Sequence, residues 1–519
     1  MDKNITILWV DDEIDLLRPH ILFLQNKGYR VITATNGYDG VEMLKDHNID
    51  LIFLDENMAG LTGIETLAHM KSVNSVVPVV MITKSEEENI MEQAIGSKIA
   101  DYLIKPVNPN QILLTIKKLT ESHRLVTEKT TSMYQSKFAQ LGFEINVAAT
   151  FEDWELIYKQ LTYWDLELES LNDKGMHEIL QTQKIDANNN FARFIRKNYE
   201  QWFSKQSDRR PMMSPNVLRH EVFPLLKNQK IALILIDNLR LDQWYTIAPV
   251  LGQYYKPEKE MLYCAILPTV TQYARNAMFS GLMPLDIVNL HPEFWTNEDE
   301  DEDSHNLHEQ ELLRKQLQRL GLSHSLSYEK ISNERQGKKV ADTLHDYLQS
   351  DLSVFVYNFV DSLSHARTNV EVIKDLAASE SGYRSITRSW LEHSTLLEII
   401  KQLSEEKIKL VITTDHGSVN VANPVKVLGD RESSSNIRYK QGRYLNYDSK
   451  NIFEVRDPQS IRLPKLNVST SYIFATAYDY MIYPKNYNHY ANFYRNTFQH
   501  GGISLEEMMA PLLVLNPVG

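Results

Sequence analysis

The stretch "VITTDHG", residues 411 to 417, is a run of β-branched residues that ends in an adjacent aspartate and histidine. A short apolar run of this kind is typical of a buried strand, and Asp415 and His416 would follow its carboxyl end. Parallel α/β sheets gather their functional groups at that end of the strands. The stretch therefore predicts an α/β domain that carries metal-binding side chains at one edge of its sheet.

The same arrangement recurs elsewhere in the last part of the chain. "IALILI" ends in Asp237, and "SVFVY" leads to Asp361 and, four residues later, His365. "FQHGGISLEEMMAPLLVL" supplies His500 ahead of a helix and a final apolar stretch. If a helix begins near Asp361, that carboxylate and His365 lie one turn apart and can face the same ion. These side chains mix oxygen and nitrogen donors, which suits zinc.

Together with a threonine from "LPTVTQYARNAMFSG", this set is large enough to hold two zinc ions. Two ions roughly 4 Å apart hold the attacking and leaving oxygens of an in-line phosphoryl displacement. A metal-bound hydroxyl at the start of the following helix would then be the nucleophile. The pattern predicts a metal-dependent phosphoryl-transfer enzyme.

This order of motifs resembles the PglZ-domain branch of the alkaline-phosphatase superfamily, from about residue 217 to 519. The resemblance implies Thr271 as the nucleophile, with Thr269 as the alternative. It also implies that one zinc ion is held by Asp237, Thr271, Asp415 and His416, and a second by Asp361, His365 and His500. A sulfatase is disfavoured because no Cys-x-Pro-x-Arg sequence surrounds the single cysteine, Cys264.

Several basic residues are candidates for substrate binding. Arg275 and Asn276 follow the nucleophile and are placed to touch phosphate, and Arg240 and Asp242 match the PglZ branch. The insertion from about 421 to 465 contains "RYKQGRYLNYDSK", which is basic and aromatic. Such a segment could receive a phosphate chain and stack a base, and it is equally compatible with an ordinary surface ribbon. Its candidate phosphate-binding residues are Arg438, Lys440 and Arg443, and its candidate stacking residues are Tyr439 and Tyr444.

The first 120 residues alternate apolar strands with helical patterns, which predicts a parallel, flavodoxin-like sheet. Polar groups again stand at the strand ends, in "ITILWVDDE", "LIFLDE", "VVMIT" and "YLIKP". Clustered carboxylates repel one another unless a hard cation such as Mg²⁺ joins them. The region therefore has the outline of a phosphoryl-transfer site.

Residues 1 to 120 resemble a response-regulator receiver domain, which implies phosphorylation of Asp55 by a sensor histidine kinase. In this family pattern Tyr102 is the switch aromatic, Thr83 meets the phosphoryl group and Lys105 pairs with it. The resemblance implies that Mg²⁺ is held by Asp11, Asp12, Asp55 and the backbone carbonyl of Asn57. Ala59 stands where the family usually has proline, which affects the rigidity of the loop and leaves the chemistry intact.

Composition narrows the class of protein further. The 519 residues carry a net charge of −13, which argues against binding of duplex DNA, and no basic recognition helix follows the receiver. No apolar run approaches the ~20 residues of a transmembrane helix, and the acidic N-terminus is unlike a signal peptide. We expect a cytoplasmic protein. The predicted α/β architecture has a receiver at 1–120, a helical bundle at 121–205 and an alkaline-phosphatase-like domain at 206–519.

This domain combination resembles the PorX type of response regulator, which the resemblance ties to type IX protein secretion and gliding. It implies a zinc phosphodiesterase for small linear or cyclic oligonucleotides, controlled by phosphorylation and phosphorylation-dependent homodimerisation. The alternative is a non-catalytic regulator that binds a sigma factor or a secretion-motor component through a zinc scaffold. A phosphomonoesterase or phosphomutase would use the same metals.

Overall fold

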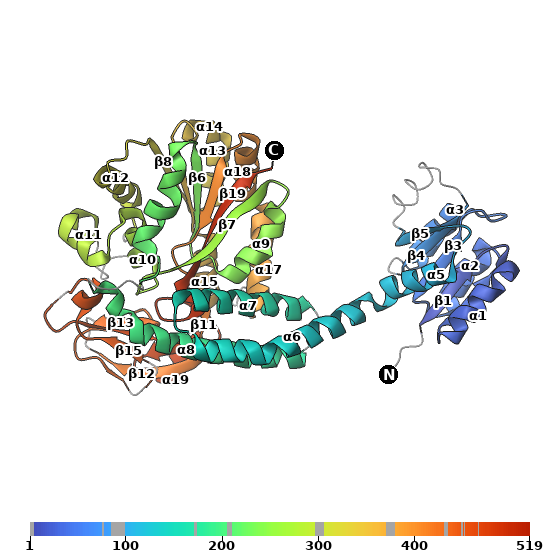
Figure 1. Cartoon of the computed structure of the whole chain (residues 1–519), viewed down its shortest axis with the longest axis horizontal. Coiled ribbons are helices and arrows are strands. Elements are labelled where there is room, and N and C mark those ends of the chain that lie inside the picture. The colour runs from blue at the N-terminus through green and yellow to red at the C-terminus, as the bar shows by residue number, and fades with distance from the viewer. Residues whose placement is uncertain are drawn as a thin grey trace. The chain divides into compact units, whose positions relative to one another are not determined.

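The computed structural model divides into two compact units, residues 1–134 and 135–519 (Figure 1). It describes residues 5–74, 77–84, 99–170, 174–204, 210–295, 306–369, 379–429, 434–447, 450, 452–465 and 467–518. None of the helices in this described part combines the length and the apolar character that a membrane span requires.

The first unit contains a five-stranded parallel sheet in the order β2-β1-β3-β4-β5. Its central strands are buried on both faces, so they read as continuous apolar runs. The strands are β1 (Thr6–Val10), β2 (Arg30–Ala34), β3 (Leu51–Asp55), β4 (Val79–Thr83) and β5 (Asp101–Ile104). The helices include α1 (Arg18–Asn26), α2 (Gly37–Asp46), α3 (Gly63–Val73) and α5 (Pro109–Ile116). The predicted flavodoxin-like domain is confirmed.

A helical region follows, as predicted for residues 121–205. Helix α6 spans Ser122–Val147, α7 spans Phe151–Ser170 and α8 spans Lys174–Asn198. Trp154 of α7 packs against Phe191 and Phe194 of α8, which buries the tryptophan almost completely. From residue 135 onward these helices belong to the same compact unit as the C-terminal residues.

The second unit is built on a six-stranded sheet in the order β7-β19-β10-β6-β9-β8. Strands β10, β6, β9 and β8 are parallel, whereas β19 runs antiparallel to both β10 and β7. The strands are β6 (Ile231–Ile236), β7 (Tyr255–Cys264), β8 (Leu326–Ile331), β9 (Leu352–Tyr357), β10 (Lys409–Thr413) and β19 (Met509–Pro517). The carboxyl ends of β6, β9 and β10 therefore meet at one edge.

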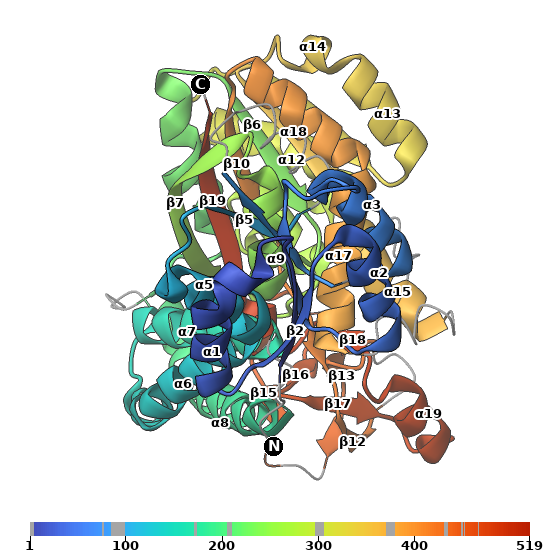
Figure 2. The same ribbon diagram turned by 90° about the vertical axis from the view of Figure 1, so that its right-hand side faces the viewer.

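Helices cover both faces of this sheet (Figure 1). The apolar side chains of α10, α11 and α12 pack on one face, and α9, α17 and α18 lie on the other. Helices α13 and α18 lie side by side (Figure 2). The helices are α9 (Leu241–Leu251), α10 (Thr271–Ser280), α11 (Pro284–Leu290), α12 (Glu309–Arg319), α13 (Glu334–Asp342), α14 (Leu344–Tyr347), α15 (Phe359–Asn369), α17 (Glu380–His393), α18 (Thr395–Glu405) and α20 (Leu505–Met508).

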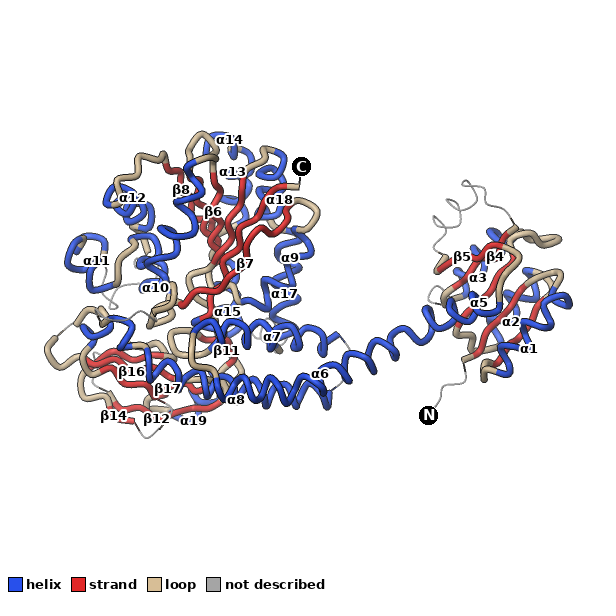
Figure 3. Tube along the Cα trace, viewed as in Figure 1, coloured by secondary structure: helices blue, strands red, loops and turns tan. Residues whose placement is uncertain are grey.

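Small sheets and helix α19 (Tyr487–Tyr494) form most of the segment between β10 and β19 (Figure 3). One sheet joins β14, β12 and β17, a second joins β13, β16 and β15, and a third joins β11 and β18. The strands are β11 (Val419–Asn420), β12 (Asn423–Leu428), β13 (Tyr439–Gly442), β14 (Asn446–Tyr447), β15 (Ile452–Val455), β16 (Ser471–Ala475), β17 (Asp479–Ile482) and β18 (Phe498–Gln499).

Candidate functional site

The first unit carries a cluster of acidic side chains at the carboxyl edge of its sheet. Asp11 and Asp12 follow β1, Asp55 ends β3, and oxygen atoms of the three carboxylates lie within 4.8 Å of one another. The Lys105 Nζ is 2.9 Å from both Asp11 Oδ2 and Asp55 Oδ1. Burial raises the pKa of the Asp55 carboxyl above its usual range, and the hydrogen bond from Lys105 counteracts that effect. This donor set fits a hard divalent cation.

The remaining residues of the predicted receiver site lie on strands of the same sheet or in the loops that follow them. Thr83 ends β4, is buried, and its hydroxyl donates to the carboxylate of Glu56. Asn57 is exposed in the loop after β3, and Tyr102 is half-buried on β5. The structure thus places the predicted phosphoacceptor, lysine and threonine at neighbouring strand ends.

The second unit carries a cluster of three possible metal ligands at its sheet edge. Asp237 follows β6, and Asp415 and His416 follow β10, so the parallel strands bring the three together. One ligand atom from each lies within 4.8 Å of the others, and all three side chains are buried. Thr271 begins α10, with its Oγ1 3.4 Å from Asp237 Oδ1 and 3.3 Å from His416 Nε2. These are the four residues predicted for one zinc ion.

A second pair of possible ligands adjoins this cluster. The Nε2 of His500 lies 3.4 Å from the Oδ1 of Asp361, which is in the first turn of α15. The imidazoles of His416 and His500 stack with their centroids 4.4 Å apart, so the pair and the cluster are immediate neighbours. His365 lies on α15, as predicted, and its side chain is outside the described residues.

Backbone contacts orient both histidines. His416 Nδ1 lies 3.1 Å from the carbonyl oxygen of Gly417, and His500 Nδ1 lies 3.2 Å from that of Thr269. A protonated Nδ1 would donate to these oxygens, which leaves each Nε2 as the metal-binding atom, the usual arrangement around ligating imidazoles. Burial lowers the pKa of His416 to about 4. The ring is therefore neutral near pH 7 and available as a ligand.

The charges in the cluster favour a divalent cation. Burial raises the pKa of Asp237 well above its usual range, and the neighbouring Asp415 and Asp361 raise it further. Burial also opposes the ionised form of Asp415, but Arg275 and His416 lower its pKa overall. The buried Oδ1 of Asn238 has no hydrogen-bond partner among the atoms that the structure describes. Oxygen and imidazole donors that crowd together in this way fit zinc.

The two candidate nucleophiles have different surroundings. Thr269 is fully buried, and its Oγ1 donates to the Gly502 carbonyl and accepts from the Gly501 N–H. Thr271 is partly exposed, and its hydroxyl faces Asp237 and His416. Only Thr271 therefore has both the access and the neighbours that a nucleophile needs.

Arg275 has a structural environment that the sequence did not reveal. Its guanidinium is fully buried, its Nε is 2.9 Å from Asp415 Oδ2, and its Nη2 pairs with Asp237. Its Nη1 lies 3.2 Å from Glu309 Oε1. These contacts indicate that Arg275 orients the carboxylates of two candidate ligands, Asp237 and Asp415, and its complete burial corrects the prediction that it touches phosphate. Asn276 is buried on the same helix, and its predicted role stays a prediction.

Replacing Arg275 with methionine should lower the free energy of unfolding by about 3–5 kcal/mol, because buried carboxylates lose their partner. Excess zinc should reduce this loss, since the cation compensates the same charges. Chemical unfolding with and without zinc measures both effects. The control is Arg388→Met, which breaks an exposed pair with Glu392 and should cost about 1 kcal/mol or less. Equal midpoints for the Arg275 variant and wild type would contradict the assignment.

Two basic residues of the insertion are buried in structural contacts. Arg438 is fully buried, with its Nε 3.0 Å from Glu507 Oε1, and Lys440 Nζ lies 3.0 Å from the Ser434 carbonyl oxygen. These contacts correct the prediction that Arg438 and Lys440 receive phosphate. Arg443 is partly exposed at the end of β13, and its role in substrate binding stays a prediction.

Two residues of the site escaped the sequence analysis. Asn238 has a positive φ of 63°, its backbone N–H lies 3.4 Å from Asp415 Oδ1, and its Nδ2 lies 3.2 Å from Asp361 Oδ1. Its position directly after Asp237 was an available signal, because asparagine tolerates this backbone conformation. Glu309 supports Arg275 from α12, and no local pattern distinguishes it from a surface glutamate.

Three families of known proteins match successive parts of this chain. Residues 7–117 match the response regulator receiver domain, 124–203 match the PorX response regulator linker domain, and 217–515 match the BREX system PglZ alkaline phosphatase-like domain. These matches define a response regulator with an alkaline phosphatase-like output domain. Because the last match spans more than half of the chain, the chain belongs to the PglZ alkaline phosphatase-like family, with the domain order of a PorX-type response regulator.

Individual relatives match the receiver region. The transcriptional regulatory protein ZraR of Klebsiella oxytoca is 32% identical over 140 residues, which is 27% of this chain and 32% of that protein. ResD of Bacillus subtilis is 33% identical over 113 residues, 22% of this chain and 47% of that protein. The chain spans about a third of the length of the ZraR relatives. The chemotaxis response regulator CheY4 of Vibrio cholerae has 28% identity and a TM-score of 0.22, covering 22% of this chain and 99% of that chain.

Proposed function

We propose that this chain is a two-component response regulator in which phosphorylation of Asp55 controls a two-zinc phosphodiesterase. Its substrates would be small linear or cyclic oligonucleotides. The observation that carries the proposal is the position of the Thr271 hydroxyl, 3.4 Å from Asp237 and 3.3 Å from His416, beside the Asp361–His500 pair. The family match supports a hydrolase of the alkaline phosphatase type.

One zinc ion would be held by Asp237, Thr271, Asp415 and His416, and a second by Asp361, His365 and His500. Bound there, zinc would supply Lewis-acid stabilisation of phosphate oxygens and favour the ionised threonine hydroxyl. In the reaction, the Thr271 oxygen forms a bond to phosphorus, the bond from phosphorus to the leaving oxygen breaks, and the proton lost by the threonine is balanced by the proton that the leaving alcohol gains. Water then adds its oxygen to phosphorus and gives a proton to the threonine oxygen as that bond breaks, which releases the phosphate monoester and restores the hydroxyl.

The receiver would control this output. A sensor histidine kinase would donate a phosphoryl group to Asp55, with Mg²⁺ held by the carboxylates of Asp11, Asp12 and Asp55 and the backbone carbonyl of Asn57. Lys105 would pair with the phosphoryl group. Phosphorylation would shift the receiver toward a conformation that forms a homodimer. By family resemblance, the protein would act in the cytoplasm and regulate type IX secretion.

Hydrolysis of a chromogenic phosphodiester beside the matching monoester tests the proposed activity. Zinc-loaded protein should cleave the diester, and chelation should remove the activity because the buried carboxylates and imidazoles need the cation to bind phosphate. Turnover of the monoester alone would redirect the assignment to a phosphomonoesterase. If the protein binds zinc and cleaves neither ester, the proposal fails, and a scaffold for a sigma factor or a secretion-motor component becomes the better interpretation.

A further inference from the structure

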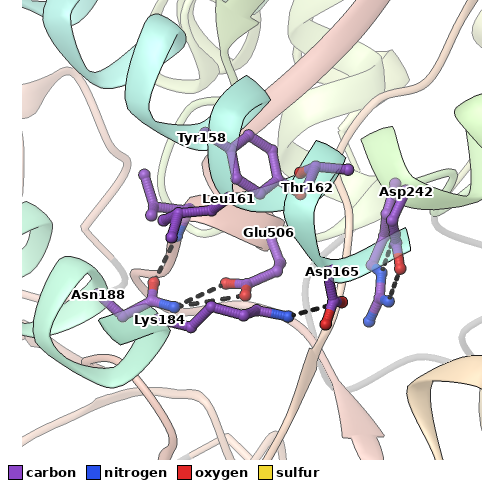
Figure 4. Close-up of a pocket in the computed structure, with 10 residues that line it drawn as sticks. Tyr158, Leu161, Thr162, Asp165, Lys184, Asn188, Asp242 and Glu506 are labelled. Atoms are coloured by element: carbon purple, nitrogen blue, oxygen red, sulfur yellow. Dashed lines mark hydrogen bonds and ion pairs between the residues drawn. The ribbon is translucent and has the colours of Figure 1, made fainter. Parts of the chain in front are cut away.

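A buried polar contact joins helix α8 of the linker to the C-terminal domain. Asn188 of α8 is fully buried, and its Nδ2 donates to both carboxylate oxygens of Glu506, at 3.3 and 3.0 Å (Figure 4). The same Nδ2 lies 3.0 Å from the Tyr478 hydroxyl, and its Oδ1 accepts the backbone N–H of Leu505 at 2.8 Å. Asn188 therefore contacts both the backbone and a side chain at the start of α20.

Helix α20 in turn holds the loop that carries His500. The backbone N–H of Gly502 donates to Glu507 Oε1 at 2.9 Å, and the Ser504 hydroxyl donates to Glu507 Oε2 at 2.7 Å. Both contacts lie within seven residues of His500 in the chain. A displacement of α20 would thus move the loop and the imidazole that it presents.

The same short helix, α20, also contacts the loop that follows β10. The backbone N–H of Gly417 donates to the Glu507 carbonyl oxygen at 3.2 Å. A Cβ atom on Gly417 would lie 2.1 Å from the carbonyl oxygen of Glu506, so these backbones are in direct contact. Gly417 immediately follows His416. Asn188 therefore contacts the same short helix, α20, that contacts the loops of His416 and His500. The rings of these two histidines stack on each other.

An ion network makes a second connection from the linker to the same region. Lys184 of α8 lies 3.1 Å from Asp165 of α7, and Asp165 lies 3.1 Å from Arg384 of α17. Arg384 lies 2.9 Å from Asp242, which pairs with Arg240. The chain of contacts starts on the linker helices and reaches the turn that follows Asp237 (Figure 4 shows the Lys184–Asp165 contact).

We propose that Asn188 is a positioning residue for the metal centre. Through it, the linker helices help to hold the candidate metal ligands in place. The inference rests on the proposed function for the identity of the metal. Through α20, Asn188 fixes the loops of His416 and His500, so its loss should let both imidazoles drift from the ligand geometry. Outer contacts that orient metal ligands are typically worth 10–100-fold in metal affinity.

The test compares zinc affinity among variants of the full chain. Asn188→Asp keeps the acceptor for the Leu505 N–H and places a carboxylate against that of Glu506, and Asn188→Ala removes the contact without adding charge. Both should weaken zinc binding about 10-fold or more. In the double variant Asn188→Asp with Glu506→Gln, the glutamine amide donates to the new carboxylate, so zinc affinity should return to near the wild-type value.

Asn190→Asp is the matched control. Asn190 lies on the same helix, and its side chain contacts the Asp186 carbonyl and Arg193 of that helix. Zinc affinity is measured by competition with a chromogenic chelator, and the midpoint of thermal unfolding is recorded for each variant. The control should bind zinc as wild type does.

A purely structural role of Asn188 would lower the midpoint of unfolding and leave zinc affinity within about twofold of wild type, and that result would overturn the proposal. If Asn188→Asp does not fold, Asn188→Ala is used instead, and a zinc affinity within about twofold of wild type would again overturn the proposal. A double variant that folds and still binds zinc 10-fold more weakly would also overturn it. Zinc affinity is measured without turnover, so it tests this inference independently of the proposed activity. Wild-type protein that binds zinc and cleaves no ester would refute the activity, and the zinc affinities of the variants would still decide the role of Asn188.

Discussion

Replacing Thr271 with alanine should lower kcat for phosphodiester cleavage by about 10³-fold or more, because the variant lacks the nucleophile. The carboxylates of Asp237 and Asp415 and the imidazole of His416 remain, so the variant should still bind zinc. Steady-state kinetics with zinc-loaded protein, together with a chelator competition for zinc, measures both quantities.

Thr271→Ser is the matched control for this experiment, since it removes a methyl group and keeps the hydroxyl at the start of α10. It should retain activity within about 10-fold of wild type. An alanine variant that cleaves the diester at the wild-type rate would exclude Thr271 as the nucleophile. The buried Thr269 would then need re-examination, although its hydroxyl is engaged by Gly501 and Gly502.

Replacing Asp55 with asparagine should abolish phosphorylation of the receiver by an acyl-phosphate donor, because an amide oxygen does not displace the acyl group from phosphorus. The homodimer that we propose to form on phosphorylation should be lost with it. Incorporation of phosphate and light scattering after size exclusion, each with Mg²⁺ and the donor present, report the two effects.

Asp46→Asn, at the exposed end of α2, is the matched control and should leave phosphorylation unchanged. If the Asp55 variant still dimerised on addition of the donor, another residue would be the phosphoacceptor. If the Asp55 variant were unphosphorylated and its diesterase activity still responded to the donor, the proposal that phosphorylation of Asp55 controls the phosphodiesterase would be wrong.

Much of the fold was predictable because its signals are local. The strands around Asp55 and Asp237 are short apolar runs buried on both faces, and each ends at a polar residue where the chain leaves the sheet. The helical region was also predicted, at residues 121–205, and its helices α6, α7 and α8 are present. The sequence did not predict that these helices from residue 135 onward form one compact unit with the C-terminal sheet, since that depends on contacts between segments far apart in the chain.

The candidate site was predictable where its residues follow a strand directly in the sequence. Asp415 and His416 lie in the loop that follows β10, and parallel pairing of β10 with β6 brings them to Asp237. The choice between Thr269 and Thr271 needed the structure, because the two lie within two residues of each other at the start of α10 and are distinguished by burial and hydrogen bonding. The side chain of His365 lies outside the described residues, so its place among the ligands stays a prediction.

The sequence by itself determined the receiver, the helical region and the order of the candidate metal-binding side chains at the strand ends. Only the tertiary structure decided that Arg275 pairs with Asp237 and Asp415, that Arg438 pairs with Glu507, and that Asn188 reaches Glu506. The physical reason is that a strand and the polar residue that ends it form one continuous piece of chain. The partner of a buried arginine or asparagine lies on another element, and its identity depends on how the whole unit packs.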